Sequence, residues 1–406
     1  MKRRNLIKNL SILPLSGMFL GKTFPLKSVL TAPVAPASSK RDLFKELGVR
    51  TFINARGTIT AMSGSLMHDY VLDAINSSSK DFCMIDELQD KVGEKIAKMV
   101  HAEAATVTSG CWSAIVLGTA GVLTGMDVNK VAQLPNLEGM KSEVIVQKAH
   151  NHAYVHALTN TGVTIVEIET SDDLERAVNE KTAMMWFLNY AALDGKISNE
   201  EWVALGKKSK IPTIIDIAAD VPPVENLWKY NDMGFDLVCI SGGKGIRGPQ
   251  SAGILMGKKD LIAAARLSAP PRGGNIGRGM KVNKEEILGM FVALERYINQ
   301  DHEKEWKIWE SWVAVINNAV KNINGVTTNE YVPPIANATP TLDISWDTDK
   351  IKISGSDLSA ALSKGNPSIE ASGGKNSLTV APWMMTSGQE KIVATRIKEE
   401  LLKAST

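Results

Sequence analysis

The sequence predicts an α/β fold in which a mostly parallel sheet is covered by helices on both faces, followed by a small C-terminal α+β domain. Short apolar runs alternate with helical patterns over residues 104–257, as is typical of βαβ units. Several of these runs are apolar throughout, which indicates strands buried on both faces. Beyond residue 326 the pattern changes to shorter strands, a Pro333-Pro334 pair and a final helix.

Composition limits the classes of function. The 406 residues suffice for two domains and a large core. The net charge is +2 and no basic run stands out beyond the N-terminus, which argues against a nucleic-acid partner. Cys83, Cys111 and Cys239 are too few and too far apart for a disulfide framework or a zinc cluster. After the N-terminus no apolar stretch approaches the ~20 residues of a membrane span.

The first 37 residues have the pattern of an export signal. Arg3 and Arg4 precede a modestly apolar stretch, LSILPLSGMFLG, and Ala35-Pro36-Ala37 resembles a cleavage site. The paired arginines favour the twin-arginine route, which carries folded proteins and predicts a periplasmic location. The alternative is a basic, disordered N-terminus. An N-terminal arm (38–60), a large domain (61–290) and a long helix with a small domain (291–406) are predicted to follow.

The individual elements follow from periodicity and from turn residues. Helices are predicted at residues 40–47, 71–75, 88–100, 111–123, 174–178, 284–324 and from 389 onward. Strands are predicted at residues 104–107, 143–147, 164–168, 183–188, 211–215, 237–240, 253–256, 341–344 and 377–380. Residues 270–281 are predicted to be irregular and residues 365–372 to form a turn.

The stretch DLVCISGGKGIRGPQSAGILMG, residues 236–257, places one lysine in a glycine-rich turn between two apolar runs. The glycines allow a backbone or a flat ligand to approach the amine of Lys244 closely. Desolvation there would lower the pKa of the amine and make it a nucleophile toward an aldehyde. The alternative is a solvated loop lysine.

A carboxylate at the end of the preceding predicted strand favours the interpretation of Lys244 as a nucleophile. Asp216 ends the apolar run 211–215, where a charge is costly unless it meets a cation. The protonated ring nitrogen of pyridoxal phosphate (PLP) is such a cation. Asp216 and Lys244 together therefore predict a PLP site with Lys244 as the Schiff-base lysine. A helix N-cap or a structural ion pair is the alternative role for Asp216.

Two further groups follow strand-like runs and are expected at the same edge of the sheet. Ser109 and Gly110 open the apolar helix, and its free backbone N–H groups would seat a phosphate. His150 follows the strand at 143–147 and would stack on the pyridine ring as a neutral imidazole. His152 and His156 are one helical turn apart, but the segment has no carboxylate or thiol that would complete a metal site. A structural role is favoured for His156.

Five segments of the sequence together resemble a known family. The segments INARGTIT, HAEAATVTSGCWSA, IIDIAAD, SGGKGIRGPQSAG and RGGNIGRGMKVNKEEILG together resemble the selenocysteine-synthase-like (L-seryl-tRNA selenium transferase-like) branch of fold-type I PLP enzymes. Within that branch they are similar to the ammonia-lyases of a phosphorylated amino-sugar acid. The resemblance extends from about residue 47 to the C-terminus. It implies an aspartate-aminotransferase-like large domain with a seven-stranded-type sheet, a small domain, and a homodimer or higher oligomer with the site at a subunit interface.

Carried over to this chain, the resemblance implies roles for individual residues. Lys244 would be the Schiff-base lysine, Asp216 the partner of the ring nitrogen and His150 the stacking residue. The expected phosphate seat and the adjoining cofactor contacts are Ser109, Gly110, Cys111, Ala218 and Ser241. Two features depart from the family pattern, the exported N-terminus and Arg247. We therefore expect the substrate to be an unphosphorylated relative of the lyase's substrate.

The reaction that the resemblance implies is α,β-elimination. Lys244 would remove the α-proton of a β-hydroxy amino acid or amino-sugar acid, and loss of water would lead to a 2-keto acid and ammonia. Guanidinium groups suit the acid groups of such a substrate. The candidates are Arg56, Arg247, Arg272 and Arg278, the last two in a cationic loop for which a solvated surface is the alternative.

Other PLP chemistries remain open to different degrees. An aminotransferase commonly grips the substrate with an arginine of the small domain, but only Arg396 follows Arg296 here. A cysteine desulfurase needs a mobile cysteine, and none follows Cys239. The balanced charge argues against selenium transfer to a tRNA. Racemase and aldolase activities use the same lysine and ring. A binding protein that kept the fold without the chemistry is the non-enzyme alternative.

Overall fold

The computed structural model describes residues 41–405, so the predicted export signal lies outside the described residues. The chain divides into two compact units, Met1–Arg50 and Thr51–Thr406. The described part of the first unit contains helix α1 (Leu43–Glu46), where the Asp42 carboxylate accepts a hydrogen bond from the Lys45 N–H. Within residues 41–405, no helix combines the length and the apolar character needed to cross a bilayer.

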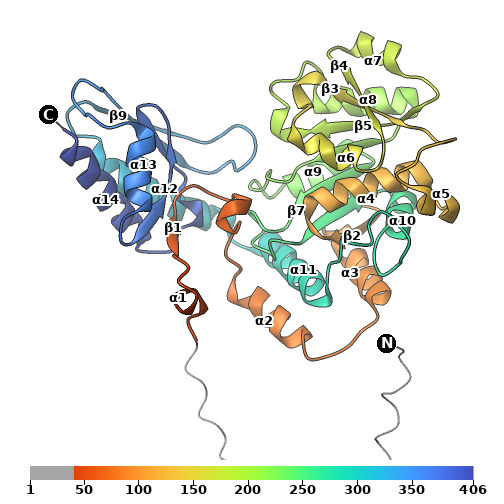
Figure 1. Cartoon of the computed structure of the whole chain (residues 1–406), viewed down its shortest axis with the longest axis horizontal. Coiled ribbons are helices and arrows are strands. Elements are labelled where there is room, and N and C mark those ends of the chain that lie inside the picture. The colour runs from red at the N-terminus through yellow and green to blue at the C-terminus, as the bar shows by residue number, and fades with distance from the viewer. Residues whose placement is uncertain (1–40, 406) are drawn as a thin grey trace, which may run out of the picture. The chain divides into compact units, whose positions relative to one another are not determined.

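A mixed seven-stranded sheet organises most of the second unit, in the order β2-β8-β7-β6-β5-β3-β4 (Figure 1). Strand β8 runs antiparallel to both of its neighbours, and the other pairs are parallel. The mostly parallel sheet is thus confirmed. The strands are β2 (Ala104–Thr108), β3 (Glu143–Gln147), β4 (Thr164–Ile168), β5 (Thr182–Leu188), β6 (Thr213–Asp216), β7 (Leu237–Ser241) and β8 (Gly253–Gly257).

Alternate side chains of each strand enter two separate hydrophobic cores. In β5, Met184 and Trp186 pack on one face, while Met185 and Phe187 pack on the other. This explains why the strand is apolar throughout. Helices α4 (Gly110–Thr124), α6 (His156–Thr159) and α10 (Lys259–Leu267) cover the first face, with α5 (Val128–Gln133) beside α4. The second face carries α2 (Asp69–Ser78), α3 (Ile85–Met99), α7 (Ser171–Ala177), α8 (Asn199–Ser209), α9 (Asn226–Met233) and α11 (Lys284–Asn299).

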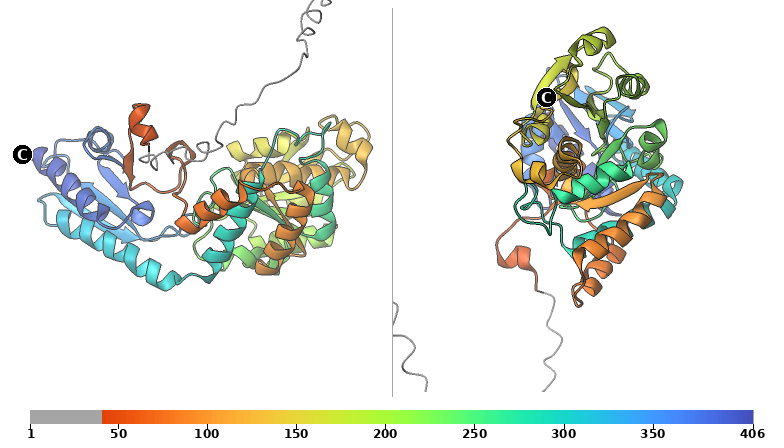
Figure 2. Two further views of the ribbon diagram at one scale, coloured as in Figure 1. Left: turned by 90° about the horizontal axis from the view of Figure 1, so that it is seen from below. Right: turned by 90° about the vertical axis from the view of Figure 1, so that its right-hand side faces the viewer.

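A smaller α+β part follows. Its antiparallel sheet has the order β12-β13-β10-β9, and α12 (His302–Val320) and α14 (Gln389–Lys403) lie side by side along it (Figures 1 and 2). The remaining elements are β9 (Val326–Tyr331), β10 (Thr341–Trp346), α13 (Gly355–Ser363), β12 (Ser372–Gly373) and β13 (Ser377–Val380). A separate parallel pair joins β1 (Phe52–Asn54) to β11 (Ser368–Glu370).

Two predicted elements are wrong. The single helix expected over residues 284–324 is two helices, because Gln300 is extended and Asp301 caps α12 by accepting a hydrogen bond from the Lys304 N–H. The turn expected over residues 365–372 contains β11, whose pairing partner β1 lies more than 300 residues away in the chain. The predicted domain boundary after residue 290 falls inside α11.

Candidate active site

A cavity of about 310 Å³ opens where β6 and β7 end and α4 begins. This is the edge of the sheet at which α/β proteins bind their ligands. Its walls come from segments that lie far apart in the chain: Thr60, Gly110, Cys111, Trp112, Ile115, Tyr154, Leu188, Tyr190, Asp216, Ala218, Ala219, Asp220, Ser241, Lys244, Gln250 and Ala336. A second hollow shares Thr60, Ser241, Lys244 and Gln250 with this cavity.

Lys244 lies in the turn-containing loop, residues 242–252, between β7 and β8. The turn is closed by hydrogen bonds from the N–H of Gly242 to the carbonyl of Ala252 and from the N–H of Gly248 to the carbonyl of Gly242, both at 2.8 Å. A Cβ atom at Gly243 would lie 2.4 Å from Cα of Gln250, so this position requires glycine. The loop is therefore closed by its own backbone hydrogen bonds and by close packing at Gly243. Within residues 41–405, the Lys244 amine has no hydrogen bond or ion pair, and the residue lines the cavity.

Asp216 ends β6 on the same cavity and is only 4% exposed. Its Oδ1 accepts hydrogen bonds from the N–H of Ala218 at 2.9 Å and from the thiol of Cys111 at 3.3 Å. Burial raises the pKa of Asp216, while the Ala218 N–H and the charge of Lys244 act in the opposite direction. The structure thus brings the predicted carboxylate and the predicted amine to one cavity.

The N-terminus of α4 forms another wall. Ser109 makes no capping hydrogen bond to the helix, since its hydroxyl pairs with the hydroxyl of Ser113 at 2.9 Å. The first N–H groups of α4 are therefore not taken by a side-chain cap and are available to an anion. Gly110 and Cys111 line the cavity, and Gly110 has φ of +82°. Gly110 and Cys111 of the predicted phosphate seat therefore share this cavity with Lys244 and Asp216, whereas Ser109 does not line it.

These groups fit PLP. The cavity offers the amine of Lys244 to bond the aldehyde and the buried carboxylate of Asp216 to pair with the ring nitrogen. The uncapped N-terminus of α4 could hold the phosphate. Ala218 and Ser241, both predicted as contacts, also line it. Trp112, Tyr154 and Tyr190 add aromatic surface at its walls. Among residues 41–405, no group of three or more His, Cys, Asp or Glu side chains is arranged to hold a metal ion.

The structure does not bring His150 to this cavity. Its ring is fully buried and stands edge-on to Phe187, with centroids 4.4 Å apart. Its Nδ1 accepts a hydrogen bond from the N–H of Leu188 at 3.2 Å. Burial lowers the pKa of His150 to about 4, so the ring is neutral as predicted. It supports the end of β5 and is not among the residues that line this cavity, and its stacking on the pyridine ring stays a prediction.

The four predicted arginines also lie outside the cavity walls. Arg247 donates a hydrogen bond to the Trp383 carbonyl at 2.8 Å, and burial lowers the pKa of its guanidinium. Arg272 pairs with Asp86 at 3.2 Å. Arg56 and Arg278 are exposed. Within a single chain, none of the four is placed to hold a substrate in this cavity.

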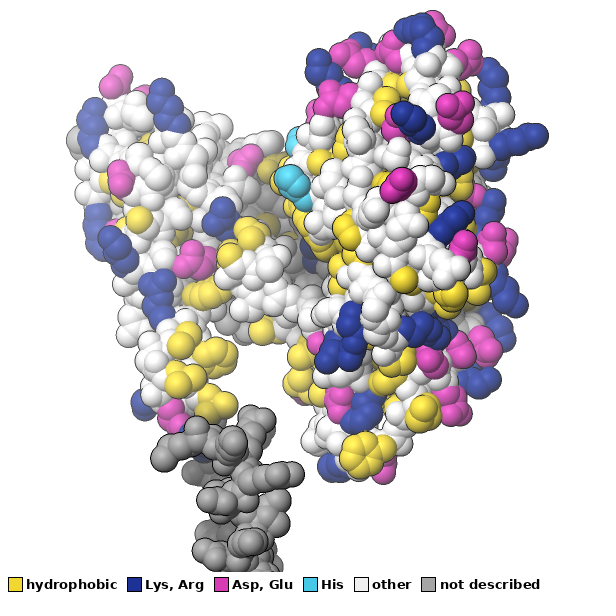
Figure 3. All heavy atoms as spheres, turned by 45° about the vertical axis from the view of Figure 1, so that its right-hand side comes forward, with side chains coloured by type: hydrophobic (Ala, Val, Ile, Leu, Met, Phe, Trp, Pro, Cys, Tyr) yellow, Lys and Arg dark blue, Asp and Glu magenta, His cyan; other side chains and the backbone are white. Residues whose placement is uncertain are grey.

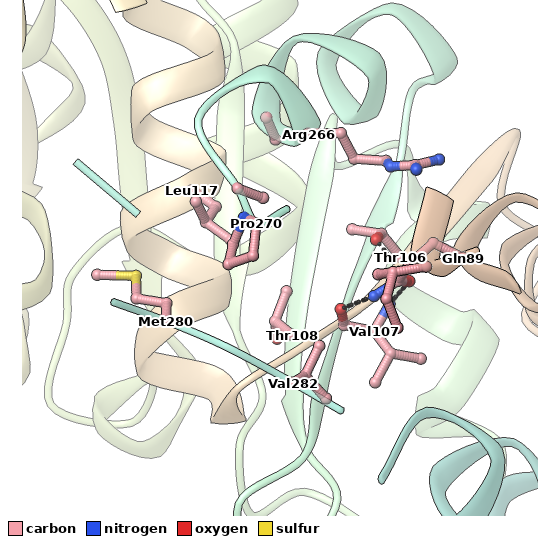
Figure 4. A pocket seen from close by; sticks show the side chains of 12 residues that line it. Gln89, Thr106, Val107, Thr108, Leu117, Arg266, Pro270, Met280 and Val282 are labelled. Atoms are coloured by element: carbon pink, nitrogen blue, oxygen red, sulfur yellow. Dashed lines mark hydrogen bonds between the residues drawn. The ribbon is translucent and has the colours of Figure 1, made fainter. Parts of the chain in front are cut away.

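The segment that carries Arg272 lines a different and much smaller cavity of about 20 Å³ (Figure 4). There the amide of Gln89 accepts hydrogen bonds from the N–H of Val107 and the hydroxyl of Thr106, both at 3.0 Å, and donates one to the Val107 carbonyl at 2.8 Å. The amide thereby joins α3 to the edge strand β2. This cavity is part of the packing between helix and sheet, and it is too small for a cofactor.

Sequence reasoning missed several wall residues. Asp220 follows Asp216 by four residues and is 3% exposed. Trp112, Tyr154, Tyr190 and Ala336 come from four separate loops or helix ends. The sequence did contain a signal for Asp220, because it closely follows an apolar strand. A carboxylate buried there is costly unless it has a partner, which indicates a functional role. The aromatic residues carry no local pattern that distinguishes them from other surface side chains.

Fold and site together define a fold-type I PLP enzyme. The sequence profile of the L-seryl-tRNA selenium transferase family matches residues 53–324, more than half of the chain, and the chain belongs to that family. A serine palmitoyltransferase from S. paucimobilis with bound PLP shares the fold, with a TM-score of 0.56 at 13% identity over 88% of this chain and 89% of that chain. The family implies a PLP cofactor, and the serine palmitoyltransferase shows the fold alone.

Individual relatives differ in how much of their length this chain spans. A D-glucosaminate-6-phosphate ammonia lyase of Salmonella typhimurium is 27% identical over 372 residues, which cover 88% of this chain and 97% of the lyase. The solved D-glucosaminate-6-phosphate ammonia-lyase has a TM-score of 0.79 at 26% identity, over 90% of this chain and 100% of that chain. An L-seryl-tRNA(Sec) selenium transferase of Mannheimia succiniciproducens is 25% identical over 265 residues, 61% of this chain but only 52% of the transferase.

Proposed function

We propose that this protein is a PLP-dependent lyase. It catalyses α,β-elimination of a β-hydroxy amino acid or amino-sugar acid, which yields a 2-keto acid and ammonia. The observation that carries the proposal is the meeting of Lys244 and Asp216 at one cavity, in a chain that spans 97% of an ammonia lyase. The match to the selenium transferases covers only about half of their length. This favours a small-molecule substrate over a tRNA.

The surface supports the same choice. On the face drawn in Figure 3, lysine and arginine side chains are interspersed with aspartate and glutamate. A protein that binds nucleic acid through its phosphates gathers cations on one face or along one groove. The +2 net charge adds no general attraction for a polyanion.

The residues around the cavity have separable tasks. The uncapped N-terminus of α4, with Gly110 and Cys111, would hold the cofactor phosphate. Asp216 would keep the ring nitrogen protonated, and Lys244 would hold the aldehyde carbon. Bound there, PLP supplies the sink for the electron pair that is released when the substrate's Cα–H bond breaks.

Lys244 then acts as the base. Its amine has no hydrogen bond or ion pair within residues 41–405 and would take the α-proton of the substrate. The buried Asp216 would stabilise positive charge on the ring, because water competes little at this buried position. Loss of the β-hydroxyl forms the Cα=Cβ bond, and addition of water to the released enamine gives the keto acid and ammonia.

The test is ammonia release without any keto-acid acceptor. Protein reconstituted with PLP is assayed with racemic serine, racemic threonine and D-glucosaminate, and Lys244→Ala is the matched control. We expect ammonia and keto acid in equal amounts from at least one substrate and none from the variant. Turnover only when an acceptor is supplied would instead indicate an aminotransferase, while racemisation or aldol cleavage releases no ammonia. Failure to retain PLP would indicate a binding protein without the chemistry.

We propose further that the working form is a homodimer or a higher homo-oligomer. The substrate carries a carboxylate, yet no arginine within residues 41–405 lines the cavity of one chain. The exposed Arg278 and Arg56 would then serve a neighbouring subunit's cavity. Mixing inactive Lys244→Ala protein with inactive Arg278→Ala protein should restore activity, because hybrid oligomers contain one intact site. No recovery, together with a monomeric mass in solution, would refute this arrangement.

Export by the twin-arginine route remains our proposal for residues 1–37. Its support is the Arg3-Arg4 pair, the following apolar stretch and the Ala35-Pro36-Ala37 site. A reporter fused to residues 1–40 should appear in the periplasm, and changing both Arg3 and Arg4 to Lys should retain it in the cytoplasm. Equal periplasmic amounts from both fusions would contradict the proposal.

A further inference from the structure

A second carboxylate, Asp220, faces the same cavity as Lys244 and is used by no step described above. It lies four residues beyond Asp216, is 3% exposed and lines the cavity. Its Oδ1 is buried and has no hydrogen-bond partner within residues 41–405. An unmatched buried carboxylate oxygen is costly for stability. Its presence beside a ligand cavity therefore points to a partner that the ligand supplies.

The surroundings of Asp220 fix its position. Its backbone carbonyl accepts a hydrogen bond from Nδ2 of Asn226 at 2.6 Å, and the side chain of Asn189 and the backbone of Ala336 lie near its carboxylate. Asn189 is fixed in turn, since its Nδ2 donates to the hydroxyl of Tyr230 at 2.8 Å and its Oδ1 accepts from Asn199 at 2.9 Å. The charged groups that face Asp220 are Asp216 and Lys244, and the titratable neighbour on its other side is Tyr230.

We propose that Asp220 is the general acid that protonates the departing β-hydroxyl group. The inference rests on the proposed lyase function and assigns a residue to the one proton transfer that Lys244 does not perform. Lys244 takes the proton from Cα, and that electron pair forms the Cα=Cβ bond. The Cβ–O bond breaks, its electron pair goes to oxygen, and the oxygen takes the proton of the Asp220 carboxyl. Water leaves, with Lys244 protonated and Asp220 ionised.

The protonation state of Asp220 suits this role. Burial raises the pKa of the carboxyl to about 7, while the nearby side chain of Asn189 opposes the shift and the charge of the neighbouring Asp216 adds to it. A carboxyl group of that pKa is protonated in part of the molecules near neutral pH and can give up its proton readily. The adjacent Asp216, with its own donors and a cation on the ring, would stay ionised. Two carboxylates in one cavity thus take different roles.

The deciding experiment compares two rates on one substrate. In D₂O, exchange of the Cα hydrogen reports proton removal by Lys244, and ammonia release reports loss of the hydroxyl. For Asp220→Asn we expect ammonia release to fall at least about 100-fold, with Cα exchange within about threefold of the unaltered protein. Asp172→Asn, an exposed aspartate on α7, is the matched control and should leave both rates unchanged. The substrate is whichever of serine, threonine and D-glucosaminate the unaltered protein deaminates.

A better leaving group provides a second readout. Chloride departs without a proton, so racemic β-chloroalanine should be deaminated by Asp220→Asn at nearly the rate of the unaltered protein. If Asp220→Asn does not fold, the unaltered protein still tests the inference. Its ammonia release from the hydroxy substrate should fall as pH rises through the pKa of Asp220, whereas its Cα exchange should not.

The outcomes separate the inference from the function on which it rests. Normal ammonia release by Asp220→Asn would overturn the role of Asp220 and leave the lyase intact. A parallel loss of exchange and release would also overturn it, because that is the result of a structural role. No ammonia from any substrate with the unaltered protein would instead refute the lyase itself.

Discussion

The thiol of Cys111 donates a hydrogen bond to Oδ1 of Asp216 across 3.3 Å, with both side chains buried. The bond joins the first turn of α4 to the end of β6. The proposed seat of the cofactor phosphate and the proposed partner of its ring nitrogen are therefore mechanically connected. Because the bond leaves the helix N–H groups free, one residue can support both ends of the cofactor.

Loss of the Cys111 thiol should weaken cofactor binding without abolishing it. In Cys111→Ala, Asp216 keeps the Ala218 N–H as a donor but loses the thiol. We expect the dissociation constant of PLP to rise about threefold to tenfold, as for the loss of one modest hydrogen bond. Titration of the apoprotein with PLP, followed by visible absorbance, measures it. Cys111→Ser retains a hydrogen-bond donor and should bind PLP nearly as tightly as the unaltered protein. Equal PLP affinity in the unaltered protein and both variants would show that the bond does not contribute to cofactor binding.

Replacement of Asp216 should affect the chemistry more than the binding. Asp216→Asn keeps the size of the side chain and removes the negative charge that would face the ring nitrogen. We expect the rate of ammonia release to fall by about 100-fold or more, with PLP still bound through Lys244. Asp216→Glu retains the charge and should lie between the two. An unchanged rate in the asparagine variant would remove Asp216 from the mechanism.

Arg247 should contribute to stability and not to substrate binding. Its guanidinium is partly buried and bonded to the Trp383 carbonyl, and Glu305 lies close enough to interact with its charge. We expect Arg247→Ala to lower the free energy of unfolding by about 2–3 kcal/mol, measured by urea denaturation, with KM unchanged. The exposed Arg56→Ala should leave stability unchanged. A large rise in KM with normal stability in Arg247→Ala would restore the substrate-binding role predicted from sequence.

The buried His150 should make the protein less stable in acid. Its folded-state pKa is about 4, against about 6.5 in the unfolded chain. Above pH 6.5 both states are neutral and nothing is lost. As pH falls from about 6.5 to about 4, only the unfolded state gains a proton, and unfolding becomes easier by about 3 kcal/mol. Urea midpoints across this range measure the loss. His150→Gln should flatten this part of the profile and the exposed His156→Gln should not, so identical slopes in all three proteins would contradict the assignment.

Local sequence patterns predicted the central sheet well, because a strand covered on both faces must be apolar throughout. Strands β3, β4 and β13 begin and end at their predicted residues. Elements set by distant partners were missed. Residues 368–370 look like a turn because Gly, Asn and Pro precede them, yet β1 provides a pairing partner. The break before α12 depends on the cap of Asp301, which a continuous apolar pattern conceals.

The residues of the candidate site also fall into two groups, those that a local sequence pattern indicates and those that depend on the packing of distant segments. Lys244 and Asp216, which line one cavity, could be singled out from sequence because each is unusual in its own segment, a lysine among glycines and a carboxylate ending an apolar strand. His150 has the same placement after a strand, but its side chain turns toward Phe187 and away from the cavity. The direction of a side chain at the end of a strand depends on the packing of neighbouring elements. Tyr154, Tyr190 and Ala336 reach the cavity from loops whose meeting is a property of the whole fold.

The most direct measurement locates the cofactor on the chain. Protein reconstituted with PLP is reduced with borohydride, which fixes PLP permanently to the lysine that holds it, and the digested peptides are weighed by mass spectrometry. The account predicts one phosphopyridoxyl group per chain, on Lys244, and none in Lys244→Ala. A label on a different lysine would contradict the assignment of Lys244. A reconstituted protein that carries no label and retains no PLP would contradict it as well.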